Sequence, residues 1–162
     1  MHHFRSASVR FSALFLTSIC SVQELSKQLQ DTSRNLFERY RAMFALRNIN
    51  TDASVLALCQ GMQHESSSAL FRHEVAYILG QIQNPVSIPT LVAHLKDTNE
   101  DNIVRHESAE ALGSIATEDC RKVLEEYLRD DVRVVKESCM VALDISDYVS
   151  SDQFSYTEKI ST

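Results

Sequence analysis

Residues that interrupt helices and build turns are scarce in this sequence. Its 162 residues include 3 glycines and 2 prolines, and tryptophan is absent. Turn-rich β architectures depend on many such residues, so the scarcity argues against them and favours long helices. Apolar residues make up 44% of the chain and charged residues 23%, a balance typical of globular rather than disordered proteins. We therefore expect an all-α globular protein.

The chain also lacks an excess of positive charge and any closely spaced pair of cysteines. Its 16 lysines and arginines face 22 acidic residues, and the net charge of -6 argues against a nucleic-acid partner. No CxxC motif occurs among the cysteines, which are Cys20, Cys59, Cys120 and Cys139. Scattered cysteines of this kind are typical of reduced thiols, so we expect a cytoplasmic protein.

The first 21 residues differ in composition from everything that follows. They contain no acidic residue, and histidines and arginines precede an apolar stretch over residues 11–20. Secretory signals and organelle transit peptides share this composition. The apolar stretch is too short to span a bilayer, and we expect no membrane partner. We interpret residues 1–21 as an unstructured leader or the start of a truncated chain, 22–149 as one repeat lobe, and 150–162 as a C-terminal tail.

One short pattern occurs twice, 33 residues apart. Residues 71–80 read FRHEVAYILG, and residues 104–113 read VRHESAEALG. In both copies Arg-His-Glu is followed by Ala, Leu and Gly, which lie three, six and seven residues after the His. A period of this length is typical of helical-repeat solenoids, in which each unit is a pair of helices stacked on its neighbours.

Helical periodicity fills the chain from residue 22 onward. The expected helices cover residues 22–30, 35–48, 69–83, 103–116, 118–128 and 131–149. Two further helices are expected to begin at residue 51 or 52 and at residue 85. Leu56 is expected on the inward face of the first of these two. An apolar pair recurs at intervals of 33, 33 and 31 residues, as Ala45-Leu46, Ile78-Leu79, Ala111-Leu112 and Ala142-Leu143. The sequence therefore predicts a HEAT-like solenoid, an α-α superhelix of about four helix pairs.

The two Arg-His-Glu copies carry the candidate chemistry. The apolar stripe of the first copy avoids His73, which shares a different helix face with Tyr77 and Gly80. Neighbouring helices pack about 8–10 Å apart, so His73 and His106 are expected to converge on one ion. Imidazole and carboxylate ligands that leave some coordination positions open are typical of non-haem Fe(II) sites, whereas a zinc site more often adds Cys or a third His.

A competing interpretation makes both triplets solvated polar faces, with Arg and Glu in weak surface ion pairs. Repetition at the same phase, each time with Gly seven residues after the His, favours a metal site. His64-Glu65 lies out of phase at a helix end, and we expect no site there. We expect His94 to be a surface or packing residue. Tyr77 and Glu110 occupy equivalent places beside the two histidines and are candidates for supporting roles, Glu110 also for a ligand.

Several of these segments together resemble deoxyhypusine hydroxylase. The resemblance runs from about Val22 to about Tyr156, and its main segments are residues 36–48, 71–81, 104–113 and 134–139. It is a resemblance to the carboxy-terminal lobe of that enzyme. The family has two HEAT-like lobes of four helix pairs, each supplying two His-Glu motifs to a di-iron centre between them. The amino-terminal lobe has no counterpart in this sequence.

The resemblance implies a role for each residue of the repeated motif. It implies His73, His106 and Glu107 as iron ligands, and Glu74 as the carboxylate that binds the substrate's amine, with metal ligation as its other candidate role. It implies two Fe(II) per complete enzyme, which use O2 to hydroxylate the deoxyhypusine side chain of a eukaryotic translation factor and so complete hypusine synthesis. That reaction makes the complete enzyme a deoxyhypusine monooxygenase.

Half of that ligand set is missing from this sequence. We therefore expect the chain to be inactive alone and to need a second lobe or a second copy. The alternative function is a non-catalytic HEAT-type module that binds another protein along its concave wall. A helical-repeat enzyme of the bilin-lyase type shares the repeat style but gives no reason for paired His-Glu motifs at one phase.

Overall fold

The computed structural model describes residues 21–151, which form α-helices and short 3-10 turns joined by loops. The expected leader and tail fall almost wholly outside these residues, so both stay predictions. A helix over residues 21–30 is followed by α2 (Leu36–Ile49), α3 (Asp52–His64), α4 (Ala69–Ile82), α5 (Ile88–Lys96), α6 (Asn102–Ile115), α7 (Glu118–Glu126) and α8 (Arg133–Ser150). Residues 21–151 contain no strand, and none of their helices is long and apolar enough to cross a bilayer.

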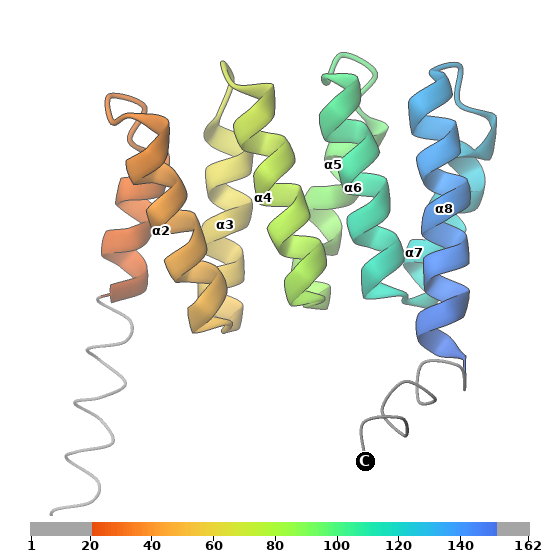
Figure 1. Ribbon diagram of the computed structural model, residues 1–162, viewed down its shortest axis with the longest axis horizontal. Coiled ribbons are helices and arrows are strands. Elements are labelled where there is room, and N and C mark those ends of the chain that lie inside the picture. The colour runs from red at the N-terminus through yellow and green to blue at the C-terminus, as the bar shows by residue number, and fades with distance from the viewer. Residues whose placement is uncertain (1–20, 152–162) are drawn as a thin grey trace, which may run out of the picture.

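The helices form two layers. In Figure 1 the second helices of the pairs, α2, α4, α6 and α8, stand side by side in one row, and the first helices stand behind them. The row is continuous, because α2 contacts α4, α4 contacts α6 and α6 contacts α8. The expectation of an all-α HEAT-like superhelix of four helix pairs is confirmed.

The same backbone device ends three of the second helices. Asn50, Gln83 and Ala116 lie 33 residues apart, and each has a left-handed φ, of 48°, 57° and 57°. Their N–H groups bond to the carbonyls of Leu46, Leu79 and Leu112, which are fully buried. A left-handed residue closes a helix by using carbonyls that the last turn leaves free. The period seen in the sequence is therefore also a period of the backbone.

Some helix limits differ from the predicted ones for identifiable reasons. The segment from Pro85 divides into a 3-10 turn, Pro85–Ser87, and then α5. Pro89 has no N–H to donate to the Pro85 carbonyl, and the N–H of Ile88 bonds to that carbonyl instead. The helix expected over 118–128 likewise ends at Glu126 and continues as a 3-10 turn. Leu56, expected to face inward, is 49% exposed.

Three arginines, of which Arg39 and Arg105 are buried and Arg72 is nearly so, tie each repeat to the next. One arginine of each of α2, α4 and α6 pairs with an acid in the loop that precedes the next second helix, at N–O distances of 2.6, 2.5 and 2.5 Å: Arg39–Glu65, Arg72–Glu100 and Arg105–Asp130. Arg39 and Arg105 also donate from Nε to the carbonyls of Leu29 and Leu95, ten residues earlier. The idea that the motif arginines form surface pairs is therefore wrong. They point inward, and the adjacent histidines lie on another face.

Candidate metal centre

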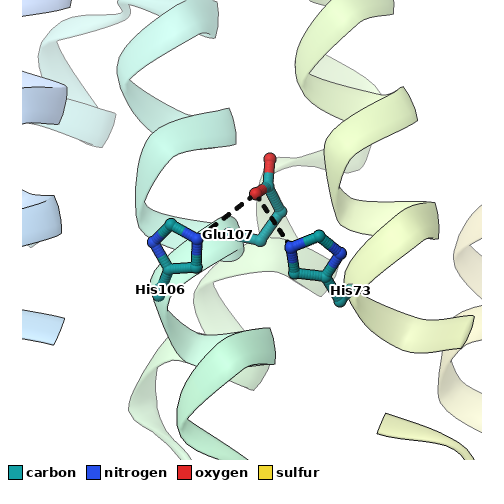
Figure 2. A group of neighbouring side chains, drawn as sticks. All are labelled: His73, His106 and Glu107. Atoms are coloured by element: carbon teal, nitrogen blue, oxygen red, sulfur yellow. Dashed lines mark ion pairs between the residues drawn. The ribbon is translucent and has the colours of Figure 1, made fainter. Parts of the chain in front are cut away.

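Two neighbouring helices bring the predicted ligands together. His73 comes from α4, and His106 and Glu107 come from α6. One ligand atom from each of the three residues lies within 4.8 Å of the others. The Glu107 carboxylate Oε2 is 3.3 Å from His73 Nε2 and 3.6 Å from His106 Nε2. Figure 2 shows this carboxylate between the two imidazole rings, whose centroids are 6.0 Å apart.

Small residues let the helices approach closely enough for this. A Cβ built on Gly80 of α4 would lie 2.9 Å from the Cα of Ala111 on α6. One built on Gly113 of α6 would lie 2.7 Å from the Cα of Ala142 on α8. Real Cβ atoms do not come so near a neighbouring backbone, so both glycines are required by close helix packing. The Gly that follows each motif histidine thus sets the spacing between the helices of the site.

The carboxylate at the centre of the cluster is poorly neutralised. Burial, followed by repulsion from Glu110 and Glu74, raises the pKa of Glu107 from its ordinary 4.5 to about 7. Within the described residues its ion-pair partners are the two histidines. Burial and then the neighbouring His106 lower the pKa of His73, which favours the neutral imidazole, the form that can donate a lone pair to a metal.

A divalent cation fits this group. Ligand atoms bound at about 2.1 Å to one ion lie roughly 3–4 Å apart, close to the separations around Glu107 Oε2. Three carboxylates crowd the two imidazoles, so a cation between them relieves the repulsion from Glu110 and Glu74 that adds to burial in raising the pKa of Glu107. His73, His106 and Glu107 are the residues that would hold it, and they leave other coordination positions open.

Further groups surround the three ligands. The Nδ1 atom of His106 forms a 2.8 Å hydrogen bond with the Ser138 hydroxyl of α8 and lies 3.3 Å from Glu110 Oε1. The Nδ1 atom of His73 is buried without a hydrogen-bond partner and lies 3.9 Å from Glu74 Oε2. The predicted substrate-binding Glu74 therefore flanks the ligand cluster without belonging to it. Its side chain is 25% exposed, so it is accessible to a ligand.

A groove of about 330 Å³ adjoins the cluster between α4 and α6. Glu107 and Glu110 line it together with the half-exposed Tyr77, and Gly80 widens it. A groove lined by two carboxylates suits a cationic ligand.

The other His and Glu residues singled out in the sequence lie apart from this site. His64 is exposed at the end of α3, and Glu65 is paired with Arg39. His94 bonds through Nδ1 to Glu100 Oε2 at 2.9 Å, which makes it part of the loop structure. No metal site at these positions was expected, and within the described residues the groups that can hold a metal ion comprise His73, His106 and Glu107.

Sequence reasoning missed two groups beside the site. Ser138 lies in the fourth repeat at the position of Glu74 and Glu107, but a serine there does not continue the His-Glu motif, so the motif gave no signal for it. Tyr40 occupies the histidine position of the first repeat, and its hydroxyl is buried without a hydrogen-bond partner. Burial and then the nearby Glu74 raise the pKa of Tyr40. The phase of Tyr40 was visible in the sequence, but its proximity to Glu74 was not.

The fold and the repeated units define a class of protein. The HEAT-repeat family model matches residues 22–103 and 68–144, and the chain belongs to the HEAT-repeat family.

Within that class the chain is similar to deoxyhypusine hydroxylases. It is 55% identical to the Drosophila melanogaster enzyme over 138 residues, 85% of this chain and 45% of that protein. It is 58% identical to the Danio rerio enzyme over the same shares of both chains. The structure of human deoxyhypusine hydroxylase in complex with glycerol superposes with a TM-score of 0.75 at 51% identity, covering 78% of this chain and 43% of the human one.

The resemblance read from the motifs is confirmed by these matches. The chain spans less than half the length of the curated relatives it matches. That it corresponds to the carboxy-terminal lobe stays a prediction.

Proposed function

We propose that this chain serves in the iron-dependent hydroxylation of deoxyhypusine, as one half of a deoxyhypusine monooxygenase. The observation that carries the proposal is the convergence of two imidazoles from adjacent repeats on the Glu107 carboxylate, within 4.8 Å. The similarity to deoxyhypusine hydroxylases supports the substrate class. In this proposal His73, His106 and Glu107 hold Fe(II), and the bound iron supplies the redox chemistry that activates O2.

The residues around the ligands have separate tasks toward the substrate. Deoxyhypusine is a long side chain with cationic amines on a translation factor. Glu74 lies beside His73 and remains accessible, so it can accept hydrogen bonds from an amine and hold the reacting carbon in place. Glu110, which lines the groove, adds negative charge that attracts the same chain.

Three protein ligands from one chain make half of a di-iron site. We propose that the complete enzyme binds two Fe(II), and that the remaining ligands come from a matching lobe or a second copy of this chain. The chain alone is then inactive toward deoxyhypusine. We also propose a cytoplasmic location, because Cys59, Cys120 and Cys139 are free, buried thiols.

Metal uptake tests the ligand assignment. The purified chain, reconstituted anaerobically with Fe(II) and desalted, is expected to retain iron. The variant H73A/H106A is expected to lose that iron with unchanged helix content by circular dichroism. H64A, which removes an exposed histidine at the end of α3, is the matched control and keeps the iron. Iron retained by H73A/H106A contradicts the assignment.

Hydroxylation of deoxyhypusine tests whether the chain needs a second half to be active. Purified chain with Fe(II), O2 and a deoxyhypusine-bearing translation factor is expected to give no hydroxylated product, as measured by mass spectrometry of the modified side chain. Product formed by the monomeric chain overturns the proposal that a second half is required. Product formed only when a second lobe is supplied supports it.

A second candidate is a non-catalytic wall that binds another protein. A row of exposed apolar residues recurs near the start of the second helices at intervals of 33, 33 and 31 residues, as Phe37, Leu70, Ile103 and Val134. Exposed apolar rows of this kind favour protein contacts. Failure of the wild-type chain to take up Fe(II) favours this candidate over the enzyme.

A further inference from the structure

The hydrogen bonds around Ser138 have a defined direction. The Ser138 Oγ atom lies 2.8 Å from the Val134 carbonyl on its own helix and 2.8 Å from His106 Nδ1. A hydroxyl has one proton to donate, and a carbonyl can only accept. The proton of Ser138 therefore goes to Val134, and toward His106 the oxygen acts as an acceptor. His106 must then carry its proton on Nδ1, with the lone pair on Nε2.

The other neighbour of His106 Nδ1 also requires a proton on that nitrogen. Glu110 Oε1 lies 3.3 Å from His106 Nδ1, and a carboxylate accepts hydrogen bonds without donating them. Ser138 is the more fixed of the two partners, because it is 4% exposed whereas the Glu110 side chain is 34% exposed. On the opposite edge of the ring, Nε2 faces Glu107 Oε2 at 3.6 Å. The imidazole is thus held with its lone pair directed into the ligand cluster.

We propose that Ser138 is a positioning residue that fixes His106 in the Nδ1–H tautomer and orients its Nε2 atom toward the metal position. A histidine in water favours the opposite tautomer, with the proton on Nε2, so this hydrogen bond changes which nitrogen can bind a metal. The link to metal binding rests on the proposed function. The tautomer itself can be measured in the metal-free chain.

In this proposal the fourth repeat supports the histidine of the third repeat. Its own histidine position is Glu137, so it supplies no imidazole, but its helix supplies the hydroxyl that serves the third repeat. The contact of Gly113 with Ala142 brings α8 close enough to α6 for that hydrogen bond. His73 has no equivalent, since its Nδ1 atom is buried without a hydrogen-bond partner. The two histidines are therefore positioned by different means.

Nitrogen-15 NMR of the imidazole rings tests the tautomer. The metal-free chain is examined at about pH 8.5, where an ordinary histidine is neutral, with His106 assigned by comparison with H106A. Wild type is expected to show the Nδ1–H form at His106. S138A is expected to shift His106 toward a mixture that includes the Nε2–H form. S146A is the matched control, since Ser146 is on the same helix and 3% exposed, and it is expected to leave the wild-type pattern.

Metal affinity is the second readout. In titrations with Co(II), followed by its visible absorption, S138A is expected to bind about tenfold or more weakly than wild type, a usual effect of removing a group that orients a metal-binding histidine. S146A is expected to bind within about twofold of wild type. S138T, which retains the hydroxyl, is expected to restore the Nδ1–H form and most of the affinity.

The outcomes separate this inference from the proposed function. Wild-type His106 in the Nε2–H form, or an S138A spectrum and affinity equal to wild type, overturns the role of Ser138 even when the chain binds metal. If wild type shows the predicted tautomer shift on S138A but binds neither Fe(II) nor Co(II), the positioning stands and the proposed iron function fails. Circular dichroism of each variant shows whether the helices are intact.

Discussion

Gly80 on α4 meets the backbone of Ala111 on α6 without any side chain between them. A Cβ at Gly80 would lie 2.9 Å from the Ala111 Cα and 3.1 Å from its Cβ. Ala111 stands one helical turn beyond Glu107, and Gly80 stands two turns beyond His73. The contact therefore fixes the separation of the two helices within one to two turns of the metal ligands.

The variant G80A tests this spacing. The added methyl meets backbone atoms that cannot rotate away, so α4 must move from α6, at a stability cost of about 1–3 kcal/mol. Because His73 and Glu107 come from these two helices, Co(II) affinity is expected to fall roughly tenfold. Titration with Co(II) and urea unfolding measure the two effects.

The control for this change is G61A. A Cβ at Gly61 meets only the side chain of Leu29, far from the ligands in the chain. This variant is expected to cost stability while leaving Co(II) affinity at the wild-type value. Equal affinities of G80A and wild type show that the helix contact does not set the ligand geometry.

Glu107 is predicted to weaken the metal-free fold while enabling metal binding. Its buried carboxylate lies among other acids, and E107Q removes that charge with little change of shape. Without metal, E107Q is expected to be more stable than wild type by about 1 kcal/mol. With Fe(II), wild type gains stability and E107Q does not, because a ligand is lost.

Thermal unfolding with and without Fe(II), under anaerobic conditions, measures both the stability of the metal-free chain and its gain in stability on metal binding. E125Q removes an exposed carboxylate of α7 and is expected to behave as wild type in both conditions. A metal-free E107Q that is less stable than wild type contradicts the account of the crowded carboxylate.

The buried arginine pairs are expected to dominate the coupling between repeats. R105M leaves Asp130, whose side chain is 10% exposed, without its guanidinium, and is expected to destabilise the chain by about 3 kcal/mol. R105M/D130N removes both charges and is expected to recover much of this loss. Urea unfolding measures the two changes.

A surface pair provides the comparison. Arg133 and Glu137 lie one turn apart on α8 with side chains 85% and 52% exposed, so R133M is expected to change stability by no more than about 0.5 kcal/mol. Equal effects of R105M and R133M contradict the inter-repeat role of Arg105.

The fold and the convergence of His73 and His106 could be predicted from the sequence because both follow the repeat period. The period does not separate Glu107 from Glu74, and only the resemblance to deoxyhypusine hydroxylase did. The positions of His73 and His106 are equivalent by phase, and stacking of equivalent helices brings equivalent residues together. The burial of the arginines was harder to predict, since a charged residue within a polar triplet is usually exposed. Arg105 is buried because it pairs with Asp130, an acid in the loop before the next second helix.

Two details could not be predicted from the sequence. Ser138 occupies the repeat position of Glu107, and its contact with His106 is the counterpart of the contact between Glu107 and His73, but a serine at that position breaks the His-Glu motif. The 3-10 turn before α5 depends on Pro89, whose missing N–H matters only once the Pro85 carbonyl is placed. In both places the chemistry of one residue and its partner atom decides the outcome, and composition or hydrophobic periodicity does not record it.

The pair between Arg39 and Glu65 predicts how the chain responds to acid. Burial alone raises the pKa of Glu65, but hydrogen bonds from Ser67, Arg39 and Ser68 outweigh it and lower the pKa from its ordinary 4.5 to about 2. A depressed pKa means that the charged form is favoured by folding. The associated stability is present in full above about pH 5 and is lost as pH falls from 4.5 toward 2.

The variant E65Q isolates that contribution. Above about pH 5 it is expected to be less stable than wild type by roughly 2–3 kcal/mol, because Arg39 loses its charged partner in a buried position. As the pH of urea unfolding is lowered toward about 3, wild type loses this advantage while E65Q has none to lose, so the two stabilities converge. E125Q changes an exposed carboxylate and is expected to follow wild type across the range. A gap between wild type and E65Q that stays constant with pH means that Glu65 titrates as an ordinary surface carboxylate, and that its pairing with Arg39 does not hold the first repeat to the second.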